Sequence, residues 1–161
     1  MTNTPPPPQP LRGLTLTQPW AGLVATGVKR IENRVWQARN MVGQRFAIHA
    51  SRQIDHRVVD SLRSEGIPYH ELWNVRSAIV AVATLHTVID KASQIPPLVE
   101  AGILPPDQER WFFGPLGFVL TNIVELETPR ILCSGARSFW ELPKDVLAKV
   151  EARLACLRGI L

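Results

Sequence analysis

The chain has 161 residues, of which 45% are hydrophobic and 20% are charged. This length fits one domain of about 100–150 residues, and the composition excludes a disordered chain, a collagen and a disulfide mini-protein. It contains no run of about 18 apolar residues, so a membrane span is not expected, and its start is unlike a secretory signal. Two cysteines are too few for a disulfide framework. We therefore expect a cytoplasmic protein with reduced thiols.

The positive charge is concentrated in one part of the sequence. Lys and Arg number 18 against 14 Asp and Glu, and the excess of +4 rests mainly on residues 29–63. That segment carries Lys29, Arg30, Arg34, Arg39, Arg45, Arg52, Arg57 and Arg63 against Glu32, Asp55 and Asp60. Arginine binds phosphate through two hydrogen bonds and stacks on bases, so the segment favours an anionic partner such as nucleic acid. A solvated surface with surplus arginines explains the same charge equally well.

The expected elements follow in chain order. Residues 1–10 hold five of the 14 prolines and no charge, which predicts a disordered proline-rich tail before a single domain at 11–161. Alternation and apolar runs predict strands at 11–17, 30–36, 45–50, 77–89 and 118–126. Helices are expected from Pro19 to Gly27 and at 55–63, 98–101 and 143–157. Five or six strands with three or four helices, without regular βα alternation, predict an α+β fold with a small barrel.

One motif carries a family resemblance. Gly27, Lys29, Glu32 and Arg34 fill the pattern G-x-K-x-x-E-x-R shortly after a Q-P-W-A helix start at 18–21. Residues 47–50 read A-I-H-A, and 117–120 and 135–140 provide a late strand and a G-A-x-x-x-W ending. Over about residues 11–142 the chain resembles the ASCH domain family, a branch of the PUA-like superfamily.

The resemblance implies a fold and two kinds of function. It implies a five- or six-stranded pseudo-barrel with three or four flanking helices and a cleft beside the first helix, lined by the motif. Some relatives resemble RNA- or DNA-binding modules, and others resemble ribonucleases or an amidohydrolase that deacetylates acetylated cytidine. In those amidohydrolases the lysine acts with a threonine, at the position of Glu32 here, and with a distant glutamate. Glu32 departs from that pattern, and neither Glu100 nor Glu109 matches a motif for the distant residue.

The motif residues could support binding or catalysis. Lys29 could hold a phosphate as a point charge or, if desolvated, act as a base; a surface lysine at a helix end is the alternative. Glu32 and Arg34 share a strand face, where the carboxylate could accept hydrogen bonds from a base or position a water, or form an ordinary surface ion pair. Catalysis, if present, is assigned to Lys29 and Glu32.

Other candidates would surround the motif. Trp20 and Trp36 bracket it and could stack on bases, whereas Trp73, Trp111 and Trp140 are expected in the core or as loop anchors. Three more candidates form a polar cluster at a strand end, namely His49, Ser51 and Arg52. A His49–Ser51 nucleophile pair is conceivable, but a polar cleft lining is favoured, and Arg137 could reach a phosphate from across the cleft.

These patterns leave two functions open. The first is a domain that binds RNA or another single-stranded nucleic acid in a basic cleft, through Trp20, Lys29, Arg34, Trp36, His49, Ser51, Arg52 and Arg137. The second is a small hydrolase acting on RNA or on a modified nucleoside. No metal-ligand spacing is present, and no cofactor is expected.

Overall fold

The computed structural model of the chain describes residues 9–159. The predicted tail therefore lies outside the described residues except for Gln9 and Pro10, which are exposed and have no regular structure. Across the described range, no helix combines the length and apolar character needed to cross a bilayer.

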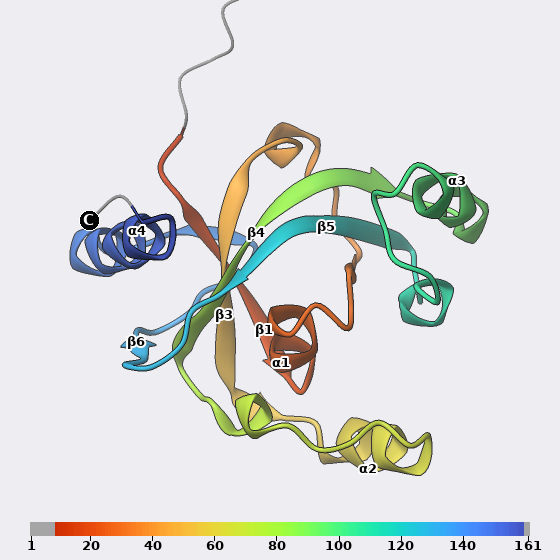
Figure 1. Cartoon of the computed structure of the whole chain (residues 1–161), viewed down its shortest axis with the longest axis horizontal. Coiled ribbons are helices and arrows are strands. Elements are labelled where there is room, and N and C mark those ends of the chain that lie inside the picture. The colour runs from red at the N-terminus through yellow and green to blue at the C-terminus, as the bar shows by residue number, and fades with distance from the viewer. Residues whose placement is uncertain (1–8, 160–161) are drawn as a thin grey trace, which may run out of the picture.

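A strongly curved mixed sheet forms the centre of the molecule (Figure 1). Its strands are β1 (Arg12–Gln18), β2 (Ile31–Arg34), β3 (Arg45–Ile54), β4 (Ala78–Ile89), β5 (Leu116–Glu125), β6 (Ile131–Leu132) and β7 (Phe139–Glu141). They follow the order β2-β5-β4-β3-β1-β7, with β6 paired to β4. Only the β1–β3 pair is parallel among these ladders. Within residues 9–159 no ladder joins β2 to β1 or β7, so the barrel has an open seam between β1 and β2.

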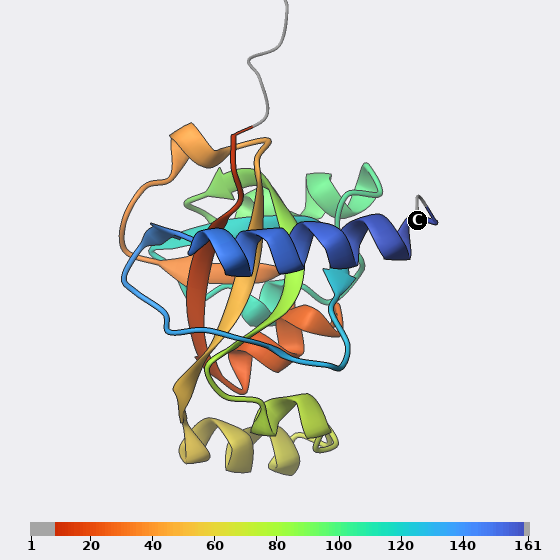
Figure 2. The same cartoon turned by 90° about the vertical axis from the view of Figure 1, so that its left-hand side faces the viewer.

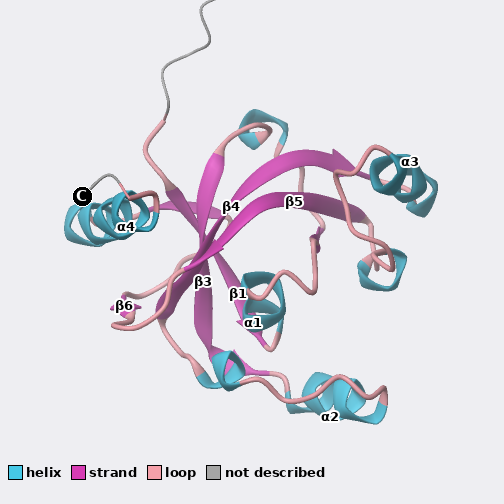
Figure 3. Cartoon of the chain, in the orientation of Figure 1, coloured by secondary structure: helices cyan, strands magenta, loops and turns pink. Residues whose placement is uncertain are grey.

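The described residues form four α-helices, which pack against the sheet or lie at its ends (Figure 3). They are α1 (Trp20–Ala25), α2 (His56–Ser64), α3 (Ile95–Glu100) and α4 (Lys144–Leu157). Short 3-10 helices lie at η1 (Arg39–Met41), η2 (Glu71–Asn74), η3 (Ala92–Gln94) and η4 (Glu109–Trp111).

The two faces of the sheet are covered by different helices. Successive strand residues point to opposite faces, and on β3 Phe46 and Ile48 pack into the cluster that contains α1. Ala47 between them packs outward with Val150 and Leu154 of α4, which lies across the outer face (Figure 2). The inner helix α1 thereby sits inside the curved sheet, close to the seam.

The predicted helices and strands are present, with changed bounds. The strand at 45–50 continues to Ile54, and the one at 30–36 ends at Arg34. Gly27 follows α1 with φ +80°, in the left-handed region predicted for a helix end. The alternation and apolar runs gave no signal for β6 and β7, which have two and three residues.

Candidate functional site

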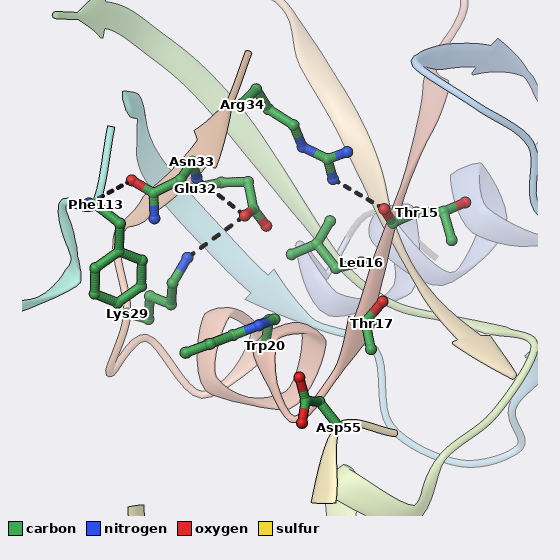
Figure 4. Close-up of a pocket in the computed structure, with 10 residues that line it drawn as sticks. All are labelled: Thr15, Leu16, Thr17, Trp20, Lys29, Glu32, Asn33, Arg34, Asp55 and Phe113. Atoms are coloured by element: carbon green, nitrogen blue, oxygen red, sulfur yellow. Dashed lines mark hydrogen bonds and ion pairs between the residues drawn. The ribbon is translucent and has the colours of Figure 1, made fainter. Parts of the chain in front are cut away.

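A polar hollow opens at the barrel seam. It has a volume of about 330 Å³, and we call it the seam hollow (Figure 4). Its walls come from β1, α1, β2 and the segments before α2 and β5. Its lining residues are Thr15, Leu16, Thr17, Trp20, Lys29, Glu32, Asn33, Arg34, Asp55 and Phe113. The G-x-K-x-x-E-x-R motif therefore places its three charged side chains on one cavity.

Lys29 and Glu32 form a buried ion pair in this hollow. The Lys29 Nζ lies 3.6 Å from Glu32 Oε1, and the two side chains are only 1% and 10% exposed. Lys29 Nζ also donates to the backbone carbonyl of Ile31 and lies 5.4 Å from the centre of the Trp20 ring. Glu32 Oε1 additionally accepts the backbone N–H of Asn33 at 3.0 Å. These contacts fix both charged groups in the wall of the cavity.

Burial changes the acid–base character of Lys29. Loss of hydration lowers the pKa of its ammonium from 10.5, although the charge and hydrogen bond of Glu32 act in the opposite direction. The nearby charge of Arg34 lowers that pKa further. Burial favours the neutral amine, which can take part in proton transfer. The carboxylate of Glu32 favours the ammonium, which can donate charge-assisted hydrogen bonds.

Arg34 bridges the open seam. Its Nη2 donates to the backbone carbonyl of Thr15 at 2.9 Å, which links β2 to β1 where no ladder does. Its Nε is buried and has no hydrogen-bond partner in the part of the chain that the structure describes. Because alternate residues of a strand direct their N–H and C=O groups to the same edge, the backbone of Thr17 faces the seam as that of Thr15 does.

Aromatic side chains form another wall of the seam hollow. Trp20 and Phe113 lie 5.9 Å apart with their rings inclined at 57°, and Phe113 is 62% exposed. Asn33 anchors the segment that carries Phe113: its Oδ1 accepts the N–H of Phe113 at 2.8 Å, and its Nδ2 donates to the carbonyl of Trp111 at 2.9 Å. An exposed ring is thus held beside the polar groups of the motif.

A second hollow of about 460 Å³ adjoins the first. We call it the arginine hollow, and it is lined by Thr15, His49, Ser51, Arg52, Gln53, Ser77, Ser134, Gly135, Ala136 and Arg137. Thr15 belongs to both linings.

A hydrogen-bond chain supports the wall between the two hollows. His49 Nε2 lies 2.8 Å from the carbonyl of Cys133; since a carbonyl only accepts, that nitrogen carries the proton. His49 Nδ1 lies 3.2 Å from the Thr15 hydroxyl, which accepts the indole N–H of Trp140 at 3.0 Å. In the neutral imidazole, Nδ1 accepts the proton of the Thr15 hydroxyl. Burial favours this neutral form, because it lowers the pKa of His49.

The predicted site residues divide between the two hollows. Trp20, Lys29, Glu32 and Arg34 line the seam hollow, and His49, Ser51, Arg52 and Arg137 line the arginine hollow. Trp36 lines neither of them, because it packs edge-on against Phe118 and Phe139.

The conceivable nucleophile pair is not formed. Ser51 Oγ exchanges hydrogen bonds with the backbone of Gln53, whereas His49 is held by Thr15 and Cys133. His49, Ser51 and Arg52 line the arginine hollow, a cavity separate from the one that the motif lines.

Sequence reasoning missed six contributors to the seam hollow, namely Thr15, Leu16, Thr17, Asn33, Asp55 and Phe113. The first four of these lie within the strands predicted at 11–17 and 30–36, where the alternation of residues was an available signal. Asp55 and Phe113 lie far along the chain from the motif, and no local pattern marks them.

The basic segment does not form one surface. Lys29 is buried beside Glu32, and Arg45 pairs with Glu151 of α4 at 3.6 Å. Arg52 faces the arginine hollow. No group of three or more His, Cys, Asp or Glu side chains suited to a metal gathers in residues 9–159.

Within residues 9–159 the open sheet and the four helices make an α+β fold of the PUA-like type, with a polar hollow at the seam of an incomplete barrel. A family model described as the ASCH domain matches residues 14–125, and the chain belongs to this family. The predicted fold and family are confirmed, and the pseudo-barrel is open. ASCH proteins are a PUA-like family whose members are proposed to bind RNA.

Solved structures give the same fold. An ASCH protein from Zymomonas mobilis is 14% identical, with a TM-score of 0.50 over 89% of this chain and 94% of that one. A mutant of that protein gives a TM-score of 0.49 at 14% identity, over 89% and 98% of the two chains. At this identity the likeness concerns the fold alone. No curated protein matches the chain.

Proposed function

We propose that this domain binds single-stranded RNA and accepts one unstacked base in the seam hollow. The observation that carries the proposal is the pairing of an aromatic wall, Trp20 and Phe113, with the charged groups of Lys29, Glu32 and Arg34. Single-stranded RNA is recognised through splayed bases that stack on aromatic rings and form hydrogen bonds along their edges. The family's proposed association with RNA points in the same direction.

The seam hollow offers both kinds of hydrogen-bonding group that a base edge needs. Glu32 Oε1 is occupied by Lys29 and Asn33, whereas Oε2 has no hydrogen bond or ion pair within residues 9–159 and is directed toward the cavity (Figure 4). That oxygen is an acceptor for an amino or imino group of a base, while Arg34 supplies donors nearby. The backbone of Thr17 adds a further donor and acceptor at the strand edge.

The test is RNA affinity measured by fluorescence anisotropy with short single-stranded oligonucleotides at 50 mM salt and above. Binding is expected to weaken steeply with salt, as phosphate contacts require. Phe113→Ala is expected to weaken binding about tenfold, because stacking contributes about 1–3 kcal/mol per base, with little change in stability since the ring is 62% exposed. Arg158→Gln, at the end of α4 and outside both hollows, is the control. Undetectable binding at 50 mM salt would overturn the proposal.

A specific observation supports hydrolysis as a second candidate. Burial lowers the pKa of Lys29, and an amine with a lowered pKa can take a proton from water as a general base. Glu32 would orient that water, and Arg34 would stabilise the negative charge that develops on the attacked group. RNA and a nucleoside acylated on its amino group are the two substrates to test.

Lys29→Met separates this candidate from binding alone. The substitution keeps most of the length of the side chain but removes the amine, so turnover is expected to disappear. The protein is expected to stay folded at reduced stability, because Glu32 loses its buried partner. Product release from either substrate is followed by chromatography, and circular dichroism checks the fold. If the wild-type protein releases no product from either substrate, or the variant retains full activity, hydrolysis through Lys29 is excluded.

A further inference from the structure

The two adjoining hollows differ in their charge. In the seam hollow, Lys29 and Arg34 are balanced by Glu32 and Asp55. The arginine hollow has Arg52 and Arg137 in its lining and no carboxylate. A balanced, partly aromatic cavity suits a base, whereas an acid-free cavity with two guanidinium groups suits an anion.

The two guanidinium groups of the arginine hollow have no partner among the described residues. Arg52 and Arg137 are exposed, and neither forms an ion pair or a side-chain hydrogen bond with residues 9–159. Residues 134–137 also make no backbone N–H hydrogen bond to the described chain. Free N–H groups and guanidinium groups that line one hollow are donors that phosphate oxygens can accept.

The loop that carries Arg137 is anchored at its start. The carbonyl of Cys133 accepts the His49 N–H at 2.8 Å, and Cys133 N donates to the carbonyl of Ser77 at 3.0 Å. Gly135 lies so close to the wall that an added Cβ would come within 2.7 Å of the His49 ring. These contacts hold the beginning of the loop against His49, on the wall of the arginine hollow.

Thr15 joins the two hollows. Its carbonyl accepts from Arg34 in the seam hollow, and its hydroxyl contacts His49 at the edge of the arginine hollow. A ligand that fills both cavities must therefore cross this residue. A nucleotide has the required form, since it carries a flat base and a phosphate joined by one sugar.

We infer that the arginine hollow binds a phosphate group, so that the unit recognised is a nucleotide with its base in the seam hollow and its phosphate between Arg52 and Arg137. This inference rests on the proposed function for the position of the base, whereas the phosphate site can be tested without RNA.

The first experiment uses inorganic phosphate as the probe, followed by the amide resonances of the protein in NMR titration. The resonances of residues 134–137 are expected to shift and saturate together in the wild type. In the Arg52→Gln/Arg137→Gln protein these shifts are expected to be lost, and in Arg158→Gln they are expected to persist. Shifts spread evenly over the exposed arginines, or absent from residues 134–137, would overturn the inference.

The second experiment measures RNA affinity against salt for the same variants. Each substitution is expected to reduce the slope of log K against log salt by about one, and to weaken binding uniformly across sequences. Phe113→Ala should leave the slope unchanged. Oligonucleotides with and without a terminal phosphate distinguish a backbone phosphate from an end phosphate. If RNA binds with an unchanged slope after both arginines are removed, the inference fails but the proposed function stands. If phosphate binds as expected and RNA does not, only the proposed function fails.

Discussion

Replacing Glu32 by Gln measures how much the buried ion pair with Lys29 contributes to the free energy of unfolding. The substitution removes a carboxylate 3.6 Å from Lys29 Nζ and leaves an ammonium that is 1% exposed without a counter-charge. Removing one partner of a buried pair costs about 3–5 kcal/mol. Lys29 keeps its bond to the Ile31 carbonyl and its position near the Trp20 ring, so we expect the lower end, about 3 kcal/mol.

The surface pair between Arg45 and Glu151 is a matched control. Its N–O distance is also 3.6 Å, but its side chains are 38% and 46% exposed. Glu151→Gln is therefore expected to cost about 0–1 kcal/mol. The double variant Glu32→Gln/Lys29→Met removes the stranded charge, and we expect it to recover most of the loss, because apolar replacement of a buried pair is often neutral.

The pH dependence of this effect has a definite sign. Because burial lowers the pKa of Lys29 below 10.5, the folded state binds fewer protons than the unfolded state between the lowered pKa and 10.5. Stability therefore rises with pH across this window. Glu32→Gln removes the two contributions that raise this pKa, so the window extends to lower pH. The difference in the free energy of unfolding between Glu32→Gln and the wild type should become smaller as the pH approaches 10.5.

Urea denaturation between pH 7 and 10, with thermal melts as a second measurement, provides the assay. A loss of about 3 kcal/mol corresponds to a fall of roughly 6–12 °C in the melting temperature for a chain of this size. If Glu32→Gln costs no more than Glu151→Gln, or if the difference from wild type does not change with pH, the assignment of a buried and energetically coupled pair is wrong.

Three further predictions concern the walls of the two hollows. Asp55→Ala removes the oxygen that accepts two amide groups at the start of α2, at 3.0 and 3.2 Å, and should lower the free energy of unfolding in urea by about 1 kcal/mol; an unchanged midpoint would contradict the cap. Gly135→Ala introduces a Cβ against Thr15 and the His49 ring and should lower the free energy of unfolding by about 1–3 kcal/mol. Unshifted NMR resonances of the loop in this variant would contradict the close approach. Burial lowers the pKa of His49 from 6.5, so the contribution of His49 to stability should be constant above pH 6.5 and fall as the pH drops toward the lowered value. His49→Gln should reduce the slope of stability against pH below 6.5, and an unchanged slope would show that other groups cause it.

Local patterns in the sequence were sufficient to predict the longer strands, the helices and the position of the motif. The alternation of leucine and threonine gave β1, and the spacing of Gly27 after Pro19 gave α1 with its left-handed end. The motif spacing placed Lys29, Glu32 and Arg34 on one stretch, and all three line the same cavity. The expected burial of Trp73, Trp111 and Trp140 is also observed.

Contacts between distant parts of the chain were outside the reach of these patterns. Phe113 reaches the seam hollow because Asn33 of β2 holds its segment. Arg137 lines the same hollow as Arg52 because Cys133 and Gly135 of its loop contact His49 and Thr15. Conversely, Trp36 packs against Phe118 and Phe139 and away from both hollows.

The sequence alone thus determined the positions of the four helices and the five longer strands and which short stretch carries the charged motif, because periodicity and capping act between residues close along the chain. The tertiary structure decided that Lys29 is desolvated, that the basic segment is dispersed, and that a balanced cavity adjoins a cationic one. Burial and charge at a site depend on every segment packed around it, and those segments come from the whole length of the chain.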